Sequence, residues 1–191
     1  MRKFVTLILV MSVFMAFVAC SKEDKENPIP AISNEQLAAE CEGRLDWARA
    51  YSVTSLASAN PNKLYWYSNS PEEASILGYP ANESFLGVDS RLNVMRIRFY
   101  DEDALEELVE EEFDTVDALS SSCIRDSVSV ESERGDGWGY IIFDGKTENT
   151  DVCIREYYYD DVFIMIALRS ELDGGAGLVH ALCSSLGLPN E

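Results

Sequence analysis

Carboxylates dominate one stretch of the chain. Between Asp101 and Asp117, ten of the seventeen residues are Asp or Glu. The stretch lacks the alternating ligands and central glycine of an EF-hand, and carboxylates along a helix are too dispersed to form an oxygen cage for calcium. A solvated helix face is the simpler interpretation, and a docking face for a basic protein is the functional one. The residues that would form this docking face are Glu106, Glu107, Glu110 and Glu111.

Nucleophilic catalysis has one pair of candidates. His180 is the only histidine, and Cys183 follows it by three residues. The pair would need a free, exposed sulfur and an oriented imidazole, which no local feature indicates. The cysteines lack the clustered spacing of a zinc site, and the glycines at 174–177 lack the Lys-Ser/Thr of a phosphate loop. The sequence therefore predicts no catalytic residue, no metal and no cofactor.

Aromatic side chains form a second group of binding candidates. They gather at residues 65–67, at Trp138 and Tyr140, and at residues 157–159. Exposed Trp66 or Trp138 could stack on a sugar ring or anchor a protein interface. Packing in the core is the alternative for most of these rings. Three consecutive tyrosines on a strand must place at least one ring on the opposite face of the sheet.

The N-terminus resembles a bacterial lipoprotein signal peptide. A short basic start is followed by apolar residues 4–17 and by the run Phe17-Val18-Ala19-Cys20, in which Phe17 replaces the usual Leu of a lipobox. The resemblance implies that residues 1–19 are removed and that the Cys20 thiol is acylated. A membrane span needs about 20 apolar residues, more than this segment offers. A conventional secretory signal, the other alternative, would not require the cysteine. Two or three acyl chains would suffice for stable attachment.

The residues after Cys20 indicate where the protein is held. Residues 21–26 are highly charged, and Asn27-Pro28-Ile29-Pro30 is stiff and non-helical. We therefore expect residues 20–32 to be a polar tether. The Lys-Glu-Asp order resembles the export signal by which some diderm bacteria send lipoproteins to the outer face of the outer membrane. A plain solvated linker is the alternative interpretation.

Two short motifs resemble modification sites. Some bacteria with this type of lipoprotein export glycosylate Asp-Ser/Thr-apolar motifs, which Asp114-Thr115-Val116 and Asp126-Ser127-Val128 match. The resemblance implies O-glycosylation at Thr115 and Ser127.

Net charge limits the partners. Residues 1–19 contain two of the 15 basic residues and none of the 34 acidic ones, so the chain from Cys20 would carry a net charge of −21. Such a domain repels phosphate backbones, and we expect no nucleic-acid partner. It is also repelled by anionic lipid, so the acyl anchor would be its main membrane contact. The acidic surface suits a cationic partner, or it only provides solubility.

Four cysteines remain after acylation of Cys20. An exported domain with an even number of thiols can hold two disulfides. The expected pairs are Cys41–Cys183, from two predicted helices, and Cys123–Cys153, from the starts of two predicted strands. Four buried free thiols are the alternative, because isolated Cys is a small core residue.

Apolar periodicity indicates the elements that would position these groups. Ser33 and Gln36 form a capping-box pair that begins a helix, whose pattern extends toward Ala59. Residues 60–90 look irregular apart from a short helix from Pro71 to Leu77. After residue 90, segments with the apolar period of a strand alternate with segments that have the period of a helix. The predicted strands are Arg91–Tyr100, Ile124–Glu131, Trp138–Phe143, Val152–Tyr159 and Val162–Arg169, and the predicted helices are Asp101–Leu119 and Ala176–Leu186.

The order of these elements predicts an α+β domain over residues 33–191. The last four strands are joined by short, turn-rich connections and should form an antiparallel meander. We expect a sheet of about five strands with helices packed on it. The function expected is a non-catalytic binding or accessory role at the cell envelope, with a basic protein or a glycan as the partner. The alternative is an inhibitor or immunity-type lipoprotein that neutralises a cationic toxin or hydrolase.

Overall fold

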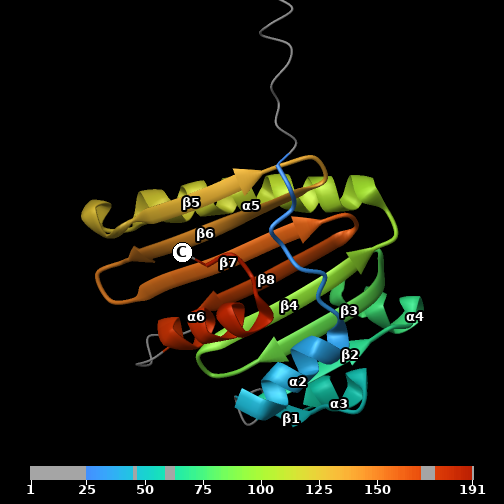
Figure 1. The fold of residues 1–191 in the computed structure, drawn as a ribbon. Coiled ribbons are helices and arrows are strands. Elements are labelled where there is room, and N and C mark those ends of the chain that lie inside the picture. The colour runs from blue at the N-terminus through green and yellow to red at the C-terminus, as the bar shows by residue number, and fades with distance from the viewer. Residues whose placement is uncertain (1–24, 45–46, 59–62, 169–174, 191) are drawn as a thin grey trace, which may run out of the picture.

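The fold is α+β, a single eight-stranded sheet with helices on both faces (Figure 1). The computed structural model describes residues 25–44, 47–58, 63–168 and 175–190. Cys20 and the predicted signal peptide lie outside the described residues. The prediction of an α+β fold is confirmed, but the sheet has eight strands rather than about five.

The elements follow one another along the chain with short connections. The strands are β1 (Ala48–Arg49), β2 (Leu64–Ser68), β3 (Ala81–Val88), β4 (Leu92–Phe99), β5 (Ser129–Arg134), β6 (Trp138–Lys146), β7 (Asp151–Tyr159) and β8 (Val162–Leu168). The helical elements are α2 (Asn34–Arg44), α3 (Val53–Ser58), α4 (Pro71–Ala74), η1 (Ser75–Leu77), α5 (Glu102–Ser122), η2 (Arg125–Ser127) and α6 (Gly175–Leu186).

Two halves of the chain meet at the centre of the sheet. The strand order is β1-β2-β3-β4-β8-β7-β6-β5, and only the short β1–β2 pair is parallel. The strands from β5 to β8 form the predicted antiparallel meander. Strand β8 then pairs with β4, from Leu92 opposite Leu168 to Arg98 opposite Val162. Because β4 precedes α5 and β8 ends the meander, this pairing makes one sheet of the two halves.

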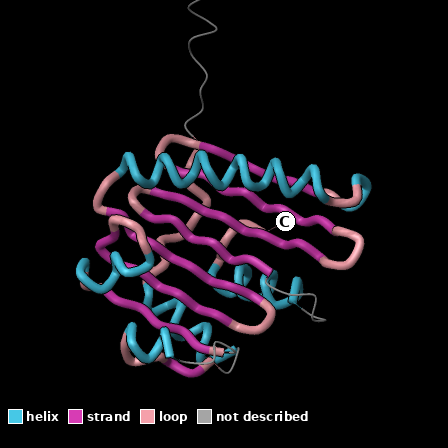
Figure 2. The backbone as a smooth tube through the Cα atoms, turned by 180° about the vertical axis from the view of Figure 1, so that it is seen from behind, coloured by secondary structure: helices cyan, strands magenta, loops and turns pink. Residues whose placement is uncertain are grey.

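Each face of the sheet has its own cover. We call the face under α2 and α6 the front face, and the face under α5 and α4 the back face (Figures 1 and 2). Alternation along β7 divides its tyrosines as expected, with Tyr157 and Tyr159 in the front core and Tyr158 against the back core. Both faces of the central strands are apolar because both are covered.

Local signals located several elements correctly. The capping box is present, since the Gln36 N–H bonds Ser33 Oγ at 3.3 Å and the Ser33 N–H bonds Gln36 Oε1 at 2.7 Å. The helix that it begins ends at Arg44, however, and does not continue toward Ala59. The long acidic helix and the last helix are confirmed as α5 and α6.

The largest difference from prediction lies in residues 60–90. This stretch contains β2 and β3, two paired strands that the sequence did not indicate. Strand β2 is only five residues long, and four of them are buried, so its burial pattern does not alternate. Strand β3 contains Asn, Ser and Gly, which are typical of loops. Pairing with β4 and packing on both faces override these weak propensities.

The N-terminal segment crosses the front face and is bonded to it. Ile29 and Ile32 are buried in the front core. The Ile32 N–H donates to the Tyr159 hydroxyl at 2.9 Å, and Arg96 Nε donates to the Ile32 carbonyl at 2.7 Å. We call residues 27–33 the strap. Packing on the domain therefore begins at Ile29, inside the stretch that was expected to be a solvated tether.

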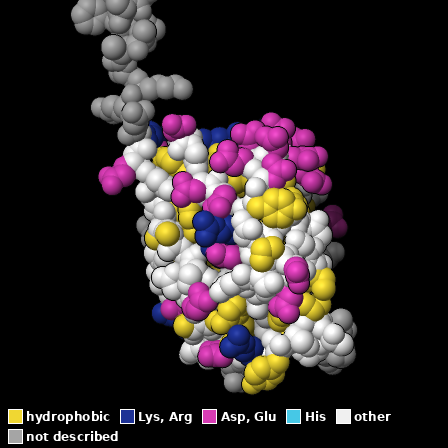
Figure 3. Space-filling view, turned by 90° about the vertical axis from the view of Figure 1, so that its right-hand side faces the viewer, with side chains coloured by type: hydrophobic (Ala, Val, Ile, Leu, Met, Phe, Trp, Pro, Cys, Tyr) yellow, Lys and Arg dark blue, Asp and Glu magenta, His cyan; other side chains and the backbone are white. Residues whose placement is uncertain are grey.

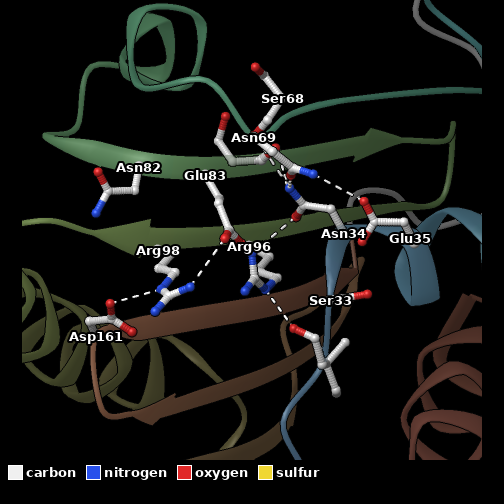
Figure 4. A network of polar contacts seen from close by, with 12 residues as sticks. Ser33, Asn34, Glu35, Ser68, Asn69, Asn82, Glu83, Arg96, Arg98 and Asp161 are labelled. Carbon is white, nitrogen blue, oxygen red and sulfur yellow. Dashed lines mark hydrogen bonds and ion pairs between the residues drawn. The ribbon is translucent and has the colours of Figure 1, made fainter.

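A polar network holds the strap and the start of α2 against β3 and β4 (Figure 4). Arg96 is 5% exposed, and its Nη1 donates to Asn34 Oδ1 at 3.1 Å and to Glu83 Oε2 at 2.9 Å. The Asn34 amide in turn donates to the Ser84 carbonyl at 3.2 Å and to Asn69 Oδ1 at 2.7 Å. A buried guanidinium is stable only when its donors are satisfied in this way.

The predicted disulfides are absent. All four cysteines in the described part of the chain are free thiols. Cys123 packs on the back face beside α5, whereas Cys153 lies in the front core, so the sheet separates them. Cys41 and Cys183 share the front core, but the Cys183 sulfur contacts the Tyr157 hydroxyl at 3.5 Å instead. The alternative of unpaired thiols is the one that this geometry supports.

Replacing Arg96 should destabilise the fold strongly. The change Arg96→Met leaves Asn34 Oδ1 without its donor, leaves the Ile32 carbonyl with only the long 3.5 Å bond from the Tyr159 hydroxyl, and takes one cation from Glu83. It should lower the free energy of unfolding by about 2–4 kcal/mol. Arg98→Met is the matched control, because the Arg98 side chain is 46% exposed and its ion pairs are screened. Urea denaturation measures both. Equal, small losses for the two variants would contradict a structural role for the network.

Candidate binding site

The described surface has an acidic cleft on the back face. It has a volume of ≈ 620 Å³ and lies between α5 and the turns that join β5 to β6 and β7 to β8. This volume falls in the usual range for ligand sites. Figure 3 shows acidic side chains gathered at the top of the adjoining face, over α5. The charged residues that line the cleft are Glu102, Glu106, Glu110, Asp160 and Arg134.

Helix α5 forms because its apolar residues recur at helical spacing and its first turn is well capped. Leu105, Leu108, Val109 and Val116 are buried against the sheet. Asp101 is the N-cap, and its Oδ1 accepts from the Asp103 N–H at 3.1 Å. Acidic side chains in the first turn also interact favourably with the helix dipole. The burial of one stripe leaves the carboxylates on the outer surface.

The carboxylates along the cleft form a regular row. Glu102, Glu106 and Glu110 are four residues apart, which places successive ones about 6 Å along the helix axis. Like charges at this spacing weaken a helix by about 0.2–0.5 kcal/mol per pair. The burial of the apolar stripe offsets this cost, and a cation in the cleft would relieve it.

The opposite wall of the cleft contains an arginine and a tyrosine. The Arg134 guanidinium carbon lies 3.6 Å from the centroid of the Phe113 ring, a cation–π contact. Tyr158 lies beside it, and its ring covers Gly139, where an added Cβ would meet the hydroxyl oxygen at 2.5 Å. Glycine at position 139 is therefore required for the tyrosine to lie flat on the sheet.

Next to the cleft, two carboxyl groups meet under α5. Glu156 projects from β7 on the back face and is 4% exposed, and its carboxyl group hydrogen-bonds that of Glu112. Burial, followed by the charge of Glu112, raises the pKa of Glu156 to about 8. Burial also raises the pKa of Glu112. One proton is therefore shared by the pair at neutral pH, and strong shifts of this kind are typical of functional sites.

The structure separates the predicted docking residues into two groups. Glu106 and Glu110 line the cleft. Glu107 and Glu111 are exposed on the same helix outside the cleft.

The sequence analysis did not single out Tyr100 as a binding residue. The Tyr100 side chain is 63% exposed, and the residue directly precedes the N-cap of α5.

The predicted sugar-stacking tryptophans are not available on the surface. Trp66 is 2% exposed and packs with Ala50 and Leu64, and Trp138 is 4% exposed in the front core. Neither indole presents a face to solvent, so the exposure that stacking on a ligand would need is not present at these two residues. Their strands are covered by helices, and the alternative of core packing holds.

His180 and Cys183 do not form a catalytic pair. The Cys183 thiol is fully buried, and burial raises its pKa to about 11, so it remains protonated. His180 is exposed, and its Nδ1 contacts the Asn190 amide at 2.7 Å. A buried thiol and an imidazole directed to another residue cannot act as nucleophile and base.

The two motif hydroxyls differ in their bonding. The Thr115 side chain is exposed, and its Oγ1 donates to the Glu111 carbonyl at 3.0 Å. The Ser127 Oγ donates to the Ile124 carbonyl at 2.7 Å and accepts from the Lys146 N–H at 2.9 Å. Glycosylation at either position stays a prediction.

Comparisons with known proteins found no relative. No protein-family model, curated protein or solved structure matches the chain.

Within the part of the chain that is described, no three His, Cys, Asp or Glu side chains gather as a metal site would require. No helix in the same residues has the length and hydrophobicity of a membrane span.

Stability should depend on pH through Glu156. Its pKa is about 8 in the folded state and near 4.5 when unfolded, so the folded state holds one more proton between these values. The contribution to stability is complete below pH 4.5 and is lost as pH rises through 8. As pH rises from 5 to 8, the free energy of unfolding of the parent should therefore fall by about 2–4 kcal/mol more than that of Glu156→Gln. Urea denaturation of both proteins at the two pH values measures this difference.

Glu107→Gln controls for the removal of one charge from the back-face surface. If it produced the same change as Glu156→Gln, net charge rather than the buried pair would be responsible.

Proposed function

We propose that this chain is a non-catalytic binding protein of the bacterial envelope, anchored through a lipid on Cys20, that captures a cationic protein in its acidic cleft. The observation that supports this most is the cleft itself, where a row of glutamates lines a hollow of ≈ 620 Å³. Charge complementarity of this kind steers association and favours basic partners over others.

The surroundings of the cleft support a protein as the partner. Tyr100 is exposed beside the first turn of α5, and exposed tyrosine is a common anchor of protein interfaces. The acidic surface continues along α5 at Glu107 and Glu111, beyond the cleft. An extended partner could therefore contact both the cleft and the outer helix face.

Two expectations about function now differ in support. Binding of a glycan rested on Trp66 and Trp138, which are buried. An inhibitor or immunity-type role is the special case in which the cationic partner is a toxin or hydrolase, and the cleft favours it over a glycan-binding role.

The anchor and the cleft would lie at the same side of the domain. Lys25, the first described residue, forms an ion pair with Glu133 on β5, the strand that leads into the turn at the cleft. Lys25 follows Cys20 by five positions, and five residue steps span at most about 18 Å. A lipid on Cys20 would thus hold the β5 edge close to the membrane, pointing outward from the outer membrane if the export signal acts as proposed.

A fluorescent oligolysine peptide tests the cationic partner class. We expect it to bind the full-length chain in nonionic detergent, and to bind at least about fivefold more weakly when salt rises from 50 to 300 mM. The double change Glu106→Gln and Glu110→Gln should weaken binding by a similar factor, as fluorescence anisotropy would measure.

The matched control is the double change Glu107→Gln and Glu111→Gln, which removes the same charge from the same helix outside the cleft. Its effect should be clearly smaller. Binding that does not change with salt, or equal losses for both double variants, would overturn the assignment of the cleft.

A further inference from the structure

A small cavity lies beneath α5, next to the acidic cleft. Its volume is ≈ 10 Å³, close to what one water-sized group requires. Glu112 and Glu156 line it together with the rings of Phe113, Tyr158 and Phe163. Two carboxyl groups and several aromatic rings around a space of this size are unusual in a core, because a buried carboxylate is costly without a donor.

The polar atoms of this cavity are incompletely bonded. Glu156 Oε2 is buried and has no hydrogen-bond partner within the described residues. The pair can share only one proton, which leaves acceptor positions without donors. No ion pair with a Lys, Arg or His side chain reaches Glu156 in the described part of the chain. A group that brings several donors and one positive charge would satisfy the site.

The cavity and the cleft share two lining residues. Val109 and Tyr158 border both spaces. The cavity therefore adjoins the cleft, with Val109 and Tyr158 between the two spaces, and a ligand from the cleft would have to pass these two side chains to reach Glu156.

We propose that this cavity binds the ammonium group of a primary alkylamine that enters from the cleft. An ammonium is close to water in size and has three donors for the two carboxylates. Its alkyl stem would pack between Val109 and Tyr158, as lysine stems pack on apolar surface. The aromatic rings add cation–π attraction, and Phe113 already binds the Arg134 guanidinium on the cleft side.

The chemical class of ligand is thus a lysine side chain of a protein partner or a free aliphatic amine. A guanidinium is planar and larger than the cavity, so arginine should not replace lysine there. The lysine form of the proposal rests on the proposed function and deepens it, whereas the free-amine form does not require a protein partner. The row of Glu102, Glu106 and Glu110 would attract either ligand.

Binding should release a proton. The shared proton between Glu112 and Glu156 occupies the position that the ammonium needs, so the ammonium enters as one proton leaves to solvent. Since the pKa of Glu156 is about 8, affinity should rise as pH increases from 6.5 to 8. Besides the two carboxyl groups themselves, the charged group that acts on the pair is Glu111 on α5, whose charge raises the pKa of Glu112. The titratable side chains of Tyr140 on β6 and Tyr158 on β7 belong to residues that line the same cavity.

Two matched cations test the cavity directly. Full-length protein in nonionic detergent is titrated with butylammonium and with butyltrimethylammonium, and dissociation constants are measured by NMR. The methylated head carries the same charge but does not fit a water-sized space. We expect it to bind at least about tenfold more weakly, and butylammonium to bind several-fold more tightly at pH 8 than at pH 6.5.

Variants identify the residue responsible. Glu156→Gln keeps the shape of the side chain and should weaken butylammonium binding at least about tenfold, whereas Glu107→Gln should change it less than twofold. Equal affinity for the two ammonium ions, or an unchanged affinity in Glu156→Gln, would overturn the ammonium site.

The outcomes separate this site from the proposed function. If butylammonium binds through Glu156 but oligolysine does not bind, the ligand is a free amine and the protein-capture function fails. If oligolysine and oligoarginine bind equally well and neither depends on Glu156, the acidic docking surface holds and the ammonium site fails. Preference for oligolysine that is lost in Glu156→Gln supports both.

Discussion

The pairing of β4 with β8 is the constraint on which the rest of the molecule depends. These strands are far apart in the chain, and their seven registered residue pairs make one sheet of two halves. Once they pair, the chain between them must leave β4, cross the back face and return as the meander. Helix α5 makes that crossing, and its 21 residues reach about 32 Å, enough to run along the meander to the outer strand β5. The acidic face of α5 is turned to solvent because its other face must cover the sheet.

The buried charged side chains of this fold differ in whether they have a partner of opposite charge. Arg96 and Arg155 each have a carboxylate partner and further acceptors, so both are satisfied; Arg155 pairs with Asp144 at 2.9 Å and donates to the Phe143 carbonyl at 3.0 Å. Glu156 has another carboxyl group as its neighbour, and no cation pairs with it among the described residues. A structural role explains the two arginines, which fix the strap and the ends of strands. It does not explain a pair of like charges in an aromatic pocket, and this is the physical reason for placing a ligand there.

The acidic domain and the proposed lipid anchor would complement each other. Strong negative charge keeps the domain soluble and repels anionic membrane surfaces, so attachment would have to come from the acyl chains. The strap would then transmit the attachment to the domain, because its hydrogen bonds to Arg96 and Tyr159 fix the chain that leads from Cys20 to the centre of the sheet. A partner held in the cleft would be held near the membrane through the same connection.

Local patterns in the sequence were sufficient for much of the fold and for part of the site. The capping box at Ser33, the alternation of β4 and the apolar stripe of α5 each depend on neighbours within a few residues, and each was predicted correctly. Strands β2 and β3 were missed because their stability comes from pairing and burial rather than from their own residues. The burial of both tryptophans, the separation of Cys123 from Cys153 and the meeting of Glu112 with Glu156 follow from which face of the sheet each residue occupies. By itself, the sequence determined the acidic charge, the types of the main elements after residue 90 and the resemblance to a lipoprotein at the N-terminus. Only the tertiary structure decided which carboxylates line a cleft and which two meet beneath it, because contacts between distant residues depend on strand order, and strand order is set by packing across the whole domain.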